Sequence, residues 1–182
     1  MKREIRAFIG HHGSGKDYQC QQLVNLGNWQ KLAFADPLRY IFFRIIGLSD
    51  EEGMRRYDEL RKTVIFNGRT GQDMIASLGM DGIAHFKPDF LVNCVVDQIR
   101  SLGDGVNACI SDLRMPAEYR ALHKLAKNEG WAFSVVLCDY NSKRKDIDAS
   151  HPTLKMPDYF IQKGYVHMEA IKEADLEDYC QS

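Results

Sequence analysis

The stretch EIRAFIGHHGSGKDYQCQQLV, residues 4–24, decides the fold of this chain. Its first residues form a nearly continuous apolar run, which is typical of a strand covered on both faces of its sheet. The glycine-rich segment GHHGSGKD follows at residues 10–17, and a helical pattern begins at Lys16. Strand, glycine loop and helix in this order are the parts of a phosphate-binding loop, so the sequence predicts an anion site here.

The loop fits the pattern GxxxxGK[ST] except at its last position, where Asp17 replaces serine or threonine. Glycines at three positions allow a tight turn whose N–H groups point inward, and the helix start adds its positive dipole end. Lys16 is expected to reach the β and γ phosphates. The predicted nucleotide-phosphate site therefore comprises Gly10, His11, His12, Gly13, Ser14, Gly15, Lys16 and Asp17.

Asp17 has two interpretations. A carboxylate at this position can bind Mg²⁺ or hold a water of the metal ion. Aspartate is also favourable in the first turn of any helix, because it faces the positive end of the helix dipole. The residues themselves leave both interpretations open.

Apolar runs and helical patterns alternate along the rest of the chain, which predicts an α/β fold with a parallel sheet of about five strands and helices on both faces. Strands are expected at residues 5–9, 32–35, 106–111, 133–138 and, more weakly, 159–162. Helices are expected at residues 16–26, 37–46, 50–66, 71–84, 89–102, 116–128 and 168–179.

The 182 residues suit a single domain. The long helix-rich interval between the second and third strands predicts a helical insertion at about residues 48–104. The polar segment at about residues 139–157 is either a solvated loop or a lid that closes over phosphates. If it is a lid, Arg144 is the expected phosphate contact.

Further polar side chains follow the predicted strands. Asp112 and Arg114 in ACISDLR come at the end of an apolar strand, where a carboxylate can face the glycine loop and order Mg²⁺. Asp36 and Arg39 in FADPLR take the corresponding place after the second strand, and a helix cap with a solvated arginine is the alternative. Arg69 and Gln72 are spaced three apart, which would put them on one helix face. They suit a phosphate and a nucleobase, or else they are ordinary surface residues.

Composition excludes several classes of protein. A net charge of −1 gives no overall case for a stable nucleic-acid partner or an anionic membrane. The apolar run near the start is too short for a signal peptide, and none is long enough to cross a membrane, so a cytoplasmic location is expected. Five scattered cysteines without CxxC spacing indicate reduced thiols, and the histidines are not spaced for zinc.

Taken together, five stretches resemble the deoxynucleoside monophosphate kinases of bacteriophages, within the adenylate-kinase-like P-loop kinases. The stretches are GHHGSGKD, FADPLR, RTGQDMIASLGMD, ISDLRMPAEY and PDYFIQKG, and they occur in the order of that family. The family's loop also has aspartate after its lysine, so Asp17 looks like a family trait. A phage-encoded member would act in the host cytoplasm.

The resemblance implies Mg²⁺-dependent transfer of the γ-phosphoryl group of ATP to a deoxynucleoside monophosphate, on a P-loop fold of three layers. Residues 10–17 and Arg144 would bind ATP. Asp17 and Asp112 would serve the metal ion, and Lys16, Asp112 and Arg114 would be catalytic. The acceptor side would comprise Asp36, Arg39, Arg69, Gln72 and Asp81.

The chain departs from that family at two places. Tyr18 stands where threonine often follows the loop, and an arginine often found after the LGMD stretch is absent around Ala84 and His85. Three other readings therefore remain: a phosphomevalonate kinase, which also has an SGKD loop, a nucleotide-binding module without turnover, and a kinase of nucleic-acid 5′ ends. The net charge argues against the last. Whether the chain forms a homodimer is left open by the sequence.

Overall fold

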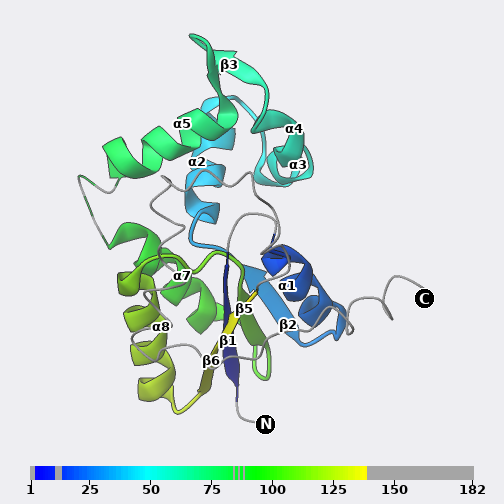
Figure 1. Cartoon of the computed structure of the whole chain (residues 1–182), viewed down its shortest axis with the longest axis vertical. Coiled ribbons are helices and arrows are strands. Elements are labelled where there is room, and N and C mark those ends of the chain that lie inside the picture. Colours follow the sequence, from blue (N-terminus) through cyan, green and yellow to red (C-terminus); the bar gives the residue numbers. More distant parts are fainter. Residues whose placement is uncertain (1–2, 11–13, 84, 86, 88, 139–182) are drawn as a thin grey trace. The chain divides into compact units, whose positions relative to one another are not determined.

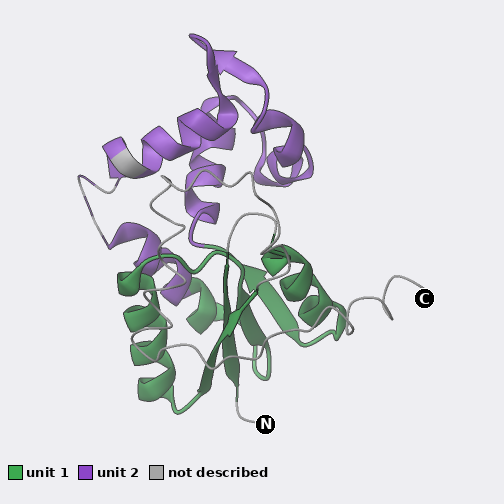
Figure 2. Ribbon diagram, viewed as in Figure 1, with its two compact units in different colours: residues 1–33, 98–182 green, residues 34–97 purple. Residues whose placement is uncertain are grey.

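The computed structural model describes residues 3–10, 14–83, 85, 87 and 89–138 (Figure 1). The chain divides into two compact units (Figure 2). Unit 1 comprises residues 1–33 and 98–182, and unit 2 comprises residues 34–97. The predicted strand at 159–162, the helix at 168–179 and the loop at 139–157 lie outside the described residues.

Unit 1 is built on a four-stranded sheet in which all neighbouring strands are parallel. Its strands, in sheet order, are β2 (Trp29–Leu32), β5 (Asn107–Ile110), β1 (Glu4–Ile9) and β6 (Ala132–Leu137). The glycine loop follows β1, which is a central strand, and β1 pairs with β5 in a register that places Ala7 opposite Ile110. The ends of β1 and β5 therefore lie side by side at one edge of the sheet.

Helices cover both faces of this sheet. On one face, Cys20 of α1 (Lys16–Asn25) is buried against Phe8 and Cys109. On the opposite side lies α8 (Pro116–Glu129), which packs against β1 and β6 and buries Leu122 (Figure 1). The predicted three-layer α/β fold, with a glycine loop joining the first strand to the first helix, is confirmed.

Unit 2 is mainly helical. Its helices are α2 (Asp36–Ile45), α3 (Asp50–Arg55), α4 (Tyr57–Leu60), α5 (Gly71–Ser77) and the π-helix η1 (Leu78–Ile83), and α7 (Phe90–Ser101) crosses the boundary to unit 1. Phe42 and Phe43 of α2 are fully buried beside Leu60 and Ile75 and form the core of this unit. The predicted cap of α3 is present, because Ser49 accepts a hydrogen bond from the N–H of Glu52.

Seven predicted elements agree with the structure within one residue at each end. They are the strands at 5–9, 106–111 and 133–138 and the helices at 16–26, 37–46, 89–102 and 116–128. The last of these ends at Gly130, whose φ of 67° provides the left-handed turn expected there. In the ranges that the structure describes, no helix is long and apolar enough to cross a membrane.

The predicted strand at 32–35 is wrong in position, since β2 occupies Trp29–Leu32. Ala33 and Phe34 are buried, but they lie in the turn that leads into α2. Their burial produces the apolar run, whereas the strand itself contains the polar pair Gln30 and Lys31.

The predicted helix at 50–66 is wrong beyond residue 60. Its last residues form β3 (Val64–Phe66), which pairs in antiparallel fashion with β4 (Arg69–Thr70). Asn67 and Gly68 connect the strands with φ values of 48° and 73°. Positive φ at both residues of a two-residue connection is the geometry that Asn-Gly favours in hairpins. The predicted helix at 71–84 also changes character, because the α-helical part ends at Ser77 and η1 follows.

Candidate active site

The glycine loop requires glycine at two described positions. A Cβ atom at Gly10 would lie 2.4 Å from the backbone oxygen of Cys138 and 2.6 Å from Oγ of Ser14. Gly15 has a φ of 84° and is the N-cap of α1, where no described side chain caps the helix. The start of a helix without a side-chain cap is a place that favours an anion. The predicted loop residues His11, His12 and Gly13 lie outside the described residues.

Gly10→Ala is expected to abolish ATP binding by the loop, because the new methyl group would displace the backbone oxygen of Cys138 or the side chain of Ser14. Isothermal titration with Mg²⁺-ATP measures the effect. Gly105→Ala is a suitable control, since it also changes a glycine with positive φ in unit 1 but places its Cβ in open space. Wild-type ATP affinity in Gly10→Ala would contradict the role given to the loop.

Lys16 lies folded against its own loop. Its Nζ donates hydrogen bonds to the backbone oxygen of Gly10 at 2.7 Å and to Oγ of Ser14 at 3.4 Å. Burial lowers the pKa of Lys16, the charge of Arg114 lowers it further, and the charges of Asp17 and Asp112 oppose this. The cation is thus held against described atoms of the loop, and the charges of three of the predicted site residues act on its pKa.

Asp112 comes two residues after β5 and is only 8% exposed. Leu113 beside it is 1% exposed, whereas Arg114 is exposed. Since the ends of β1 and β5 lie side by side, the sheet brings Asp112 and Arg114 to the edge that also carries Lys16. The prediction that these residues share one edge of the sheet agrees with this arrangement.

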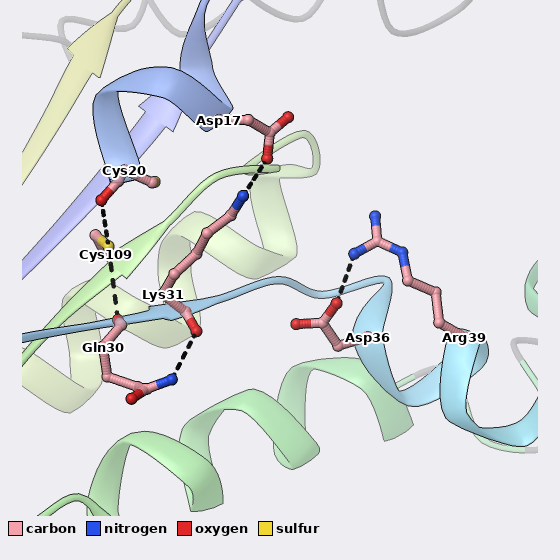
Figure 3. Close-up of polar contacts among 7 residues, drawn as sticks. All are labelled: Asp17, Cys20, Gln30, Lys31, Asp36, Arg39 and Cys109. Atoms are coloured by element: carbon pink, nitrogen blue, oxygen red, sulfur yellow. Dashed lines mark hydrogen bonds and ion pairs between the residues drawn. The ribbon is translucent and has the colours of Figure 1, made fainter. Parts of the chain in front are cut away.

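Asp17 forms an ion pair with Lys31 of β2, with 2.6 Å between Nζ and Oδ1 (Figure 3). Burial acts to raise the pKa of Asp17, but the hydrogen bond and charge of Lys31 outweigh it and the pKa is lowered. This direction fits the 78% exposure of the Asp17 side chain, since an exposed carboxyl loses little hydration. The sequence did not single out Lys31, because one lysine within a short strand follows no motif.

Glu118 is a second residue that the sequence analysis missed. It lies in the first turn of α8, and its Oε2 accepts hydrogen bonds from the backbone N–H groups of Arg114 and Met115, at 2.7 and 2.8 Å. Burial raises the pKa of Glu118 to about 7, the two N–H groups act in the opposite direction, and the charge of Asp112 raises it again. Proline at the first helical position followed two residues later by glutamate is a sequence signal that could have revealed it.

Unit 2 holds the predicted acceptor residues. Asp36 and Arg39, in the first turn of α2, form an ion pair of 2.5 Å (Figure 3), and the Arg39 guanidinium lies 4.6 Å from the ring centroid of Tyr57. The Arg39 side chain is half-buried between this carboxylate and this ring. Asp81 is exposed in η1.

The prediction that Arg69 and Gln72 share one helix face is wrong. Arg69 belongs to β4, and Gln72 lies in the first turn of α5, so the helical spacing does not apply. Both side chains are exposed, and Arg69 donates a hydrogen bond of 3.3 Å to Oγ of Ser77. The hairpin at Asn67-Gly68 is the reason for this difference.

A metal ion at this site would need ligands from its substrate. Among the residues that the structure describes, no group of three or more His, Cys, Asp or Glu side chains is placed to hold one. Mg²⁺ in phosphoryl transfer commonly uses one or two carboxylates together with phosphate oxygens and water. The buried carboxylate of Asp112 and the hydroxyl of Ser14 are hard oxygen donors of this kind, so the residues fit Mg²⁺. Arg144 lies outside the described residues.

No protein-family model and no curated protein matches the chain. Among solved structures, it is similar to an APS kinase of Mycobacterium tuberculosis in complex with AMPPNP and APS, with 13% identity over 100% of this chain and 99% of that chain and a TM-score of 0.44. A mutant of the same enzyme shows 15% identity over 80% and 81% of the chains and a TM-score of 0.41. Because both scores are below 0.5, the fold is assigned from the topology of the chain itself.

Proposed function

We propose that this protein transfers the γ-phosphoryl group of ATP to a nucleoside monophosphate, in a reaction that depends on Mg²⁺. One observation supports this most strongly: the ends of β1 and β5 lie side by side, which brings Asp112 and Arg114 to the edge of the sheet that carries Lys16 of the glycine loop. Phosphoryl transfer requires little covalent chemistry from the protein and depends on positioned charges. A lysine in the glycine loop, a buried carboxylate and an arginine at one edge of the sheet meet that requirement.

The proposed active residues of unit 1 that the structure describes each have a separate role. The N–H groups at the start of α1 bind phosphate oxygens, and Lys16 moves from its loop contacts to the β and γ phosphates. Arg114 neutralises charge that develops on the transferred group. Asp112 and Ser14 would hold Mg²⁺ directly or through water. When bound, Mg²⁺ stabilises negative charge on the phosphates.

The proposal gives Asp17 a task that depends on Lys31. Paired with Lys31, Asp17 keeps its negative charge and supports the start of α1 without the bare carboxylate repelling the phosphates. Direct ligation of the metal ion is therefore assigned to Asp112 in preference to Asp17. The phage kinases that the chain resembles also have aspartate after the loop lysine, which is consistent with the same role for this side chain in them.

The acceptor is assigned to unit 2 and to the helical insertion at about residues 48–104. This assignment rests on the resemblance of FADPLR and RTGQDMIASLGMD and on the chemistry of their side chains. Arg39 and Arg69 suit the phosphate of the acceptor, Gln72 suits a base, and Asp36 and Asp81 suit hydroxyl or amino groups.

The experiment is an ADP-release assay with Mg²⁺-ATP and a panel of acceptors. The panel contains the four deoxynucleoside monophosphates, their ribose forms, phosphomevalonate and a 5′-hydroxyl oligonucleotide. Turnover with at least one mononucleotide is expected. Turnover with phosphomevalonate alone or with the oligonucleotide alone would reject the nucleotide acceptor, whereas ATP binding without any product would indicate a binding module.

Lys31→Met is expected to raise the pKa of Asp17 toward its ordinary value, because the ammonium group lowers it. A carboxyl with a lowered pKa contributes stability above its ordinary pKa, and that contribution disappears as the pH falls through the lowered value. The Asp17 side chain of this ion pair is exposed, so loss of the pair is expected to lower the free energy of unfolding by less than about 1 kcal/mol at neutral pH. Titration of the Asp17 carboxyl by NMR in both proteins measures the shift, and an unchanged pKa would contradict the pairing.

A further inference from the structure

The connection between β5 and α8 carries two of the proposed active residues, yet it has no regular structure of its own. It runs from Ser111 to Met115 and contains Asp112 and Arg114. A segment that lacks the regular hydrogen bonds of a strand or a helix needs other contacts to hold its backbone in one conformation. The described contacts of this segment show what holds it.

Contacts at three places along the segment hold its backbone. At its start, the N–H of Ser111 donates to the backbone oxygen of Leu32 at 3.3 Å. In its middle, Leu113 is 1% exposed and is anchored in the core. At its end, a single atom, Oε2 of Glu118, accepts the N–H groups of both Arg114 and Met115. Glu118 thus binds the backbone of this segment at two successive residues.

Capping of α8 explains only one of the two bonds made by Glu118. In a capping box, the third residue of the helix accepts the N–H of the N-cap residue, which here is Met115. The second bond goes one residue further back, to Arg114, and at 2.7 Å it is the shorter of the two. The backbone at Arg114 is therefore held by an interaction that an ordinary helix start does not need.

We propose that Glu118 is a positioning residue for phosphoryl transfer, which holds the segment carrying Asp112 and Arg114 in its active conformation. This inference rests on the proposed function. Glu118 touches neither phosphate nor metal ion and acts through the backbone of Arg114 and Met115. Reaction rates depend steeply on such positioning, since a displacement of about 1 Å can cost roughly 100-fold in rate.

The test compares Glu118→Ala with Glu118→Gln, and Glu129→Ala at the other end of α8 serves as a matched control. The glutamine oxygen still accepts both N–H groups, whereas alanine removes the acceptor. We expect Glu118→Ala to lower kcat by roughly 10- to 100-fold with KM for ATP within about 3-fold of wild type. Glu118→Gln and the control are expected to retain kcat within about 3-fold of wild type.

Two further measurements separate positioning from folding. Amide NMR signals of Arg114 and Met115 report whether their hydrogen bonds are present, and thermal unfolding shows whether each variant is folded at the assay temperature. A lower melting temperature with unchanged kcat in Glu118→Ala would overturn the inference, because Glu118 would then act only as a helix cap. Equal losses of kcat in the alanine and glutamine variants would also overturn it. Absence of turnover in the wild-type protein would overturn the proposed function and, with it, this role.

Discussion

Lys16→Ala is expected to lower kcat/KM for phosphoryl transfer by roughly 100- to 1,000-fold, the usual effect of removing one group that stabilises charge in the transition state. The side chain is folded against the loop, where its Nζ donates hydrogen bonds to the backbone oxygen of Gly10 and to Oγ of Ser14. It makes no contribution to the apolar core, so the variant is expected to fold normally. The steady-state ADP-release assay and thermal unfolding measure both quantities.

A matched control is available on α8. Lys124 is exposed and lies in the middle of that helix, so Lys124→Ala removes a lysine without touching the loop. It is expected to retain wild-type kinetics, since single exposed lysines contribute little. If Lys16→Ala kept most of its activity while folded, the assignment of the glycine loop to phosphate binding would be wrong.

Asp112→Asn is expected to raise the Mg²⁺ concentration for half-maximal rate by roughly 10- to 100-fold, the range seen when groups that support a metal ion are changed. Asparagine keeps the shape of the side chain but removes the negative charge that attracts the cation. The buried position of Asp112 makes this charge more effective than one in water. Initial rates measured over a range of Mg²⁺ at saturating ATP give the half-maximal concentration.

Asp17→Asn tests which of the two carboxylates, Asp17 or Asp112, binds Mg²⁺. Because Asp17 is paired with Lys31, its replacement is expected to change the Mg²⁺ requirement much less than Asp112→Asn. A large change in Asp17→Asn together with an unchanged Mg²⁺ requirement in Asp112→Asn would reverse the assignment and make Asp17 the ligand.

The elements around the glycine loop could be predicted from sequence because their signals are local. The apolar run that becomes β1, the loop GHHGSGKD and the helix from Lys16 are contiguous in the chain. Pro116 and Gly130 similarly marked the two ends of α8. Patterns of this kind need no knowledge of the tertiary structure.

The predicted secondary structure is wrong at one place where a local turn signal was not used and at another where tertiary packing determines which residues are buried. Asn67-Gly68 is a strong hairpin signal that lies between the predicted helices at 50–66 and 71–84, and the hairpin places Arg69 in β4. Ala33 and Phe34 look like strand residues because they are buried, although they lie in a turn.

The two residues of the site that sequence patterns missed, Lys31 and Glu118, depend on the tertiary structure in different ways. Lys31 meets Asp17 only because β2 lies in the same sheet as β1. Glu118 is a local neighbour of Arg114, but its raised pKa reflects burial, which the sequence does not report. Sequence patterns therefore predicted the loop and the carboxylate at the strand end, and the structure was needed to add the partners that hold them.

The most direct test of the central proposal is transfer of labelled phosphate. The protein is incubated with Mg²⁺ and ATP labelled at the γ-phosphorus, together with each deoxynucleoside monophosphate, and the products are separated by chromatography. The proposal predicts a labelled diphosphate with at least one acceptor in the wild-type protein and almost none with Lys16→Ala. Bound ATP with no labelled diphosphate from any nucleotide would contradict it and would identify this chain as a nucleotide-binding module.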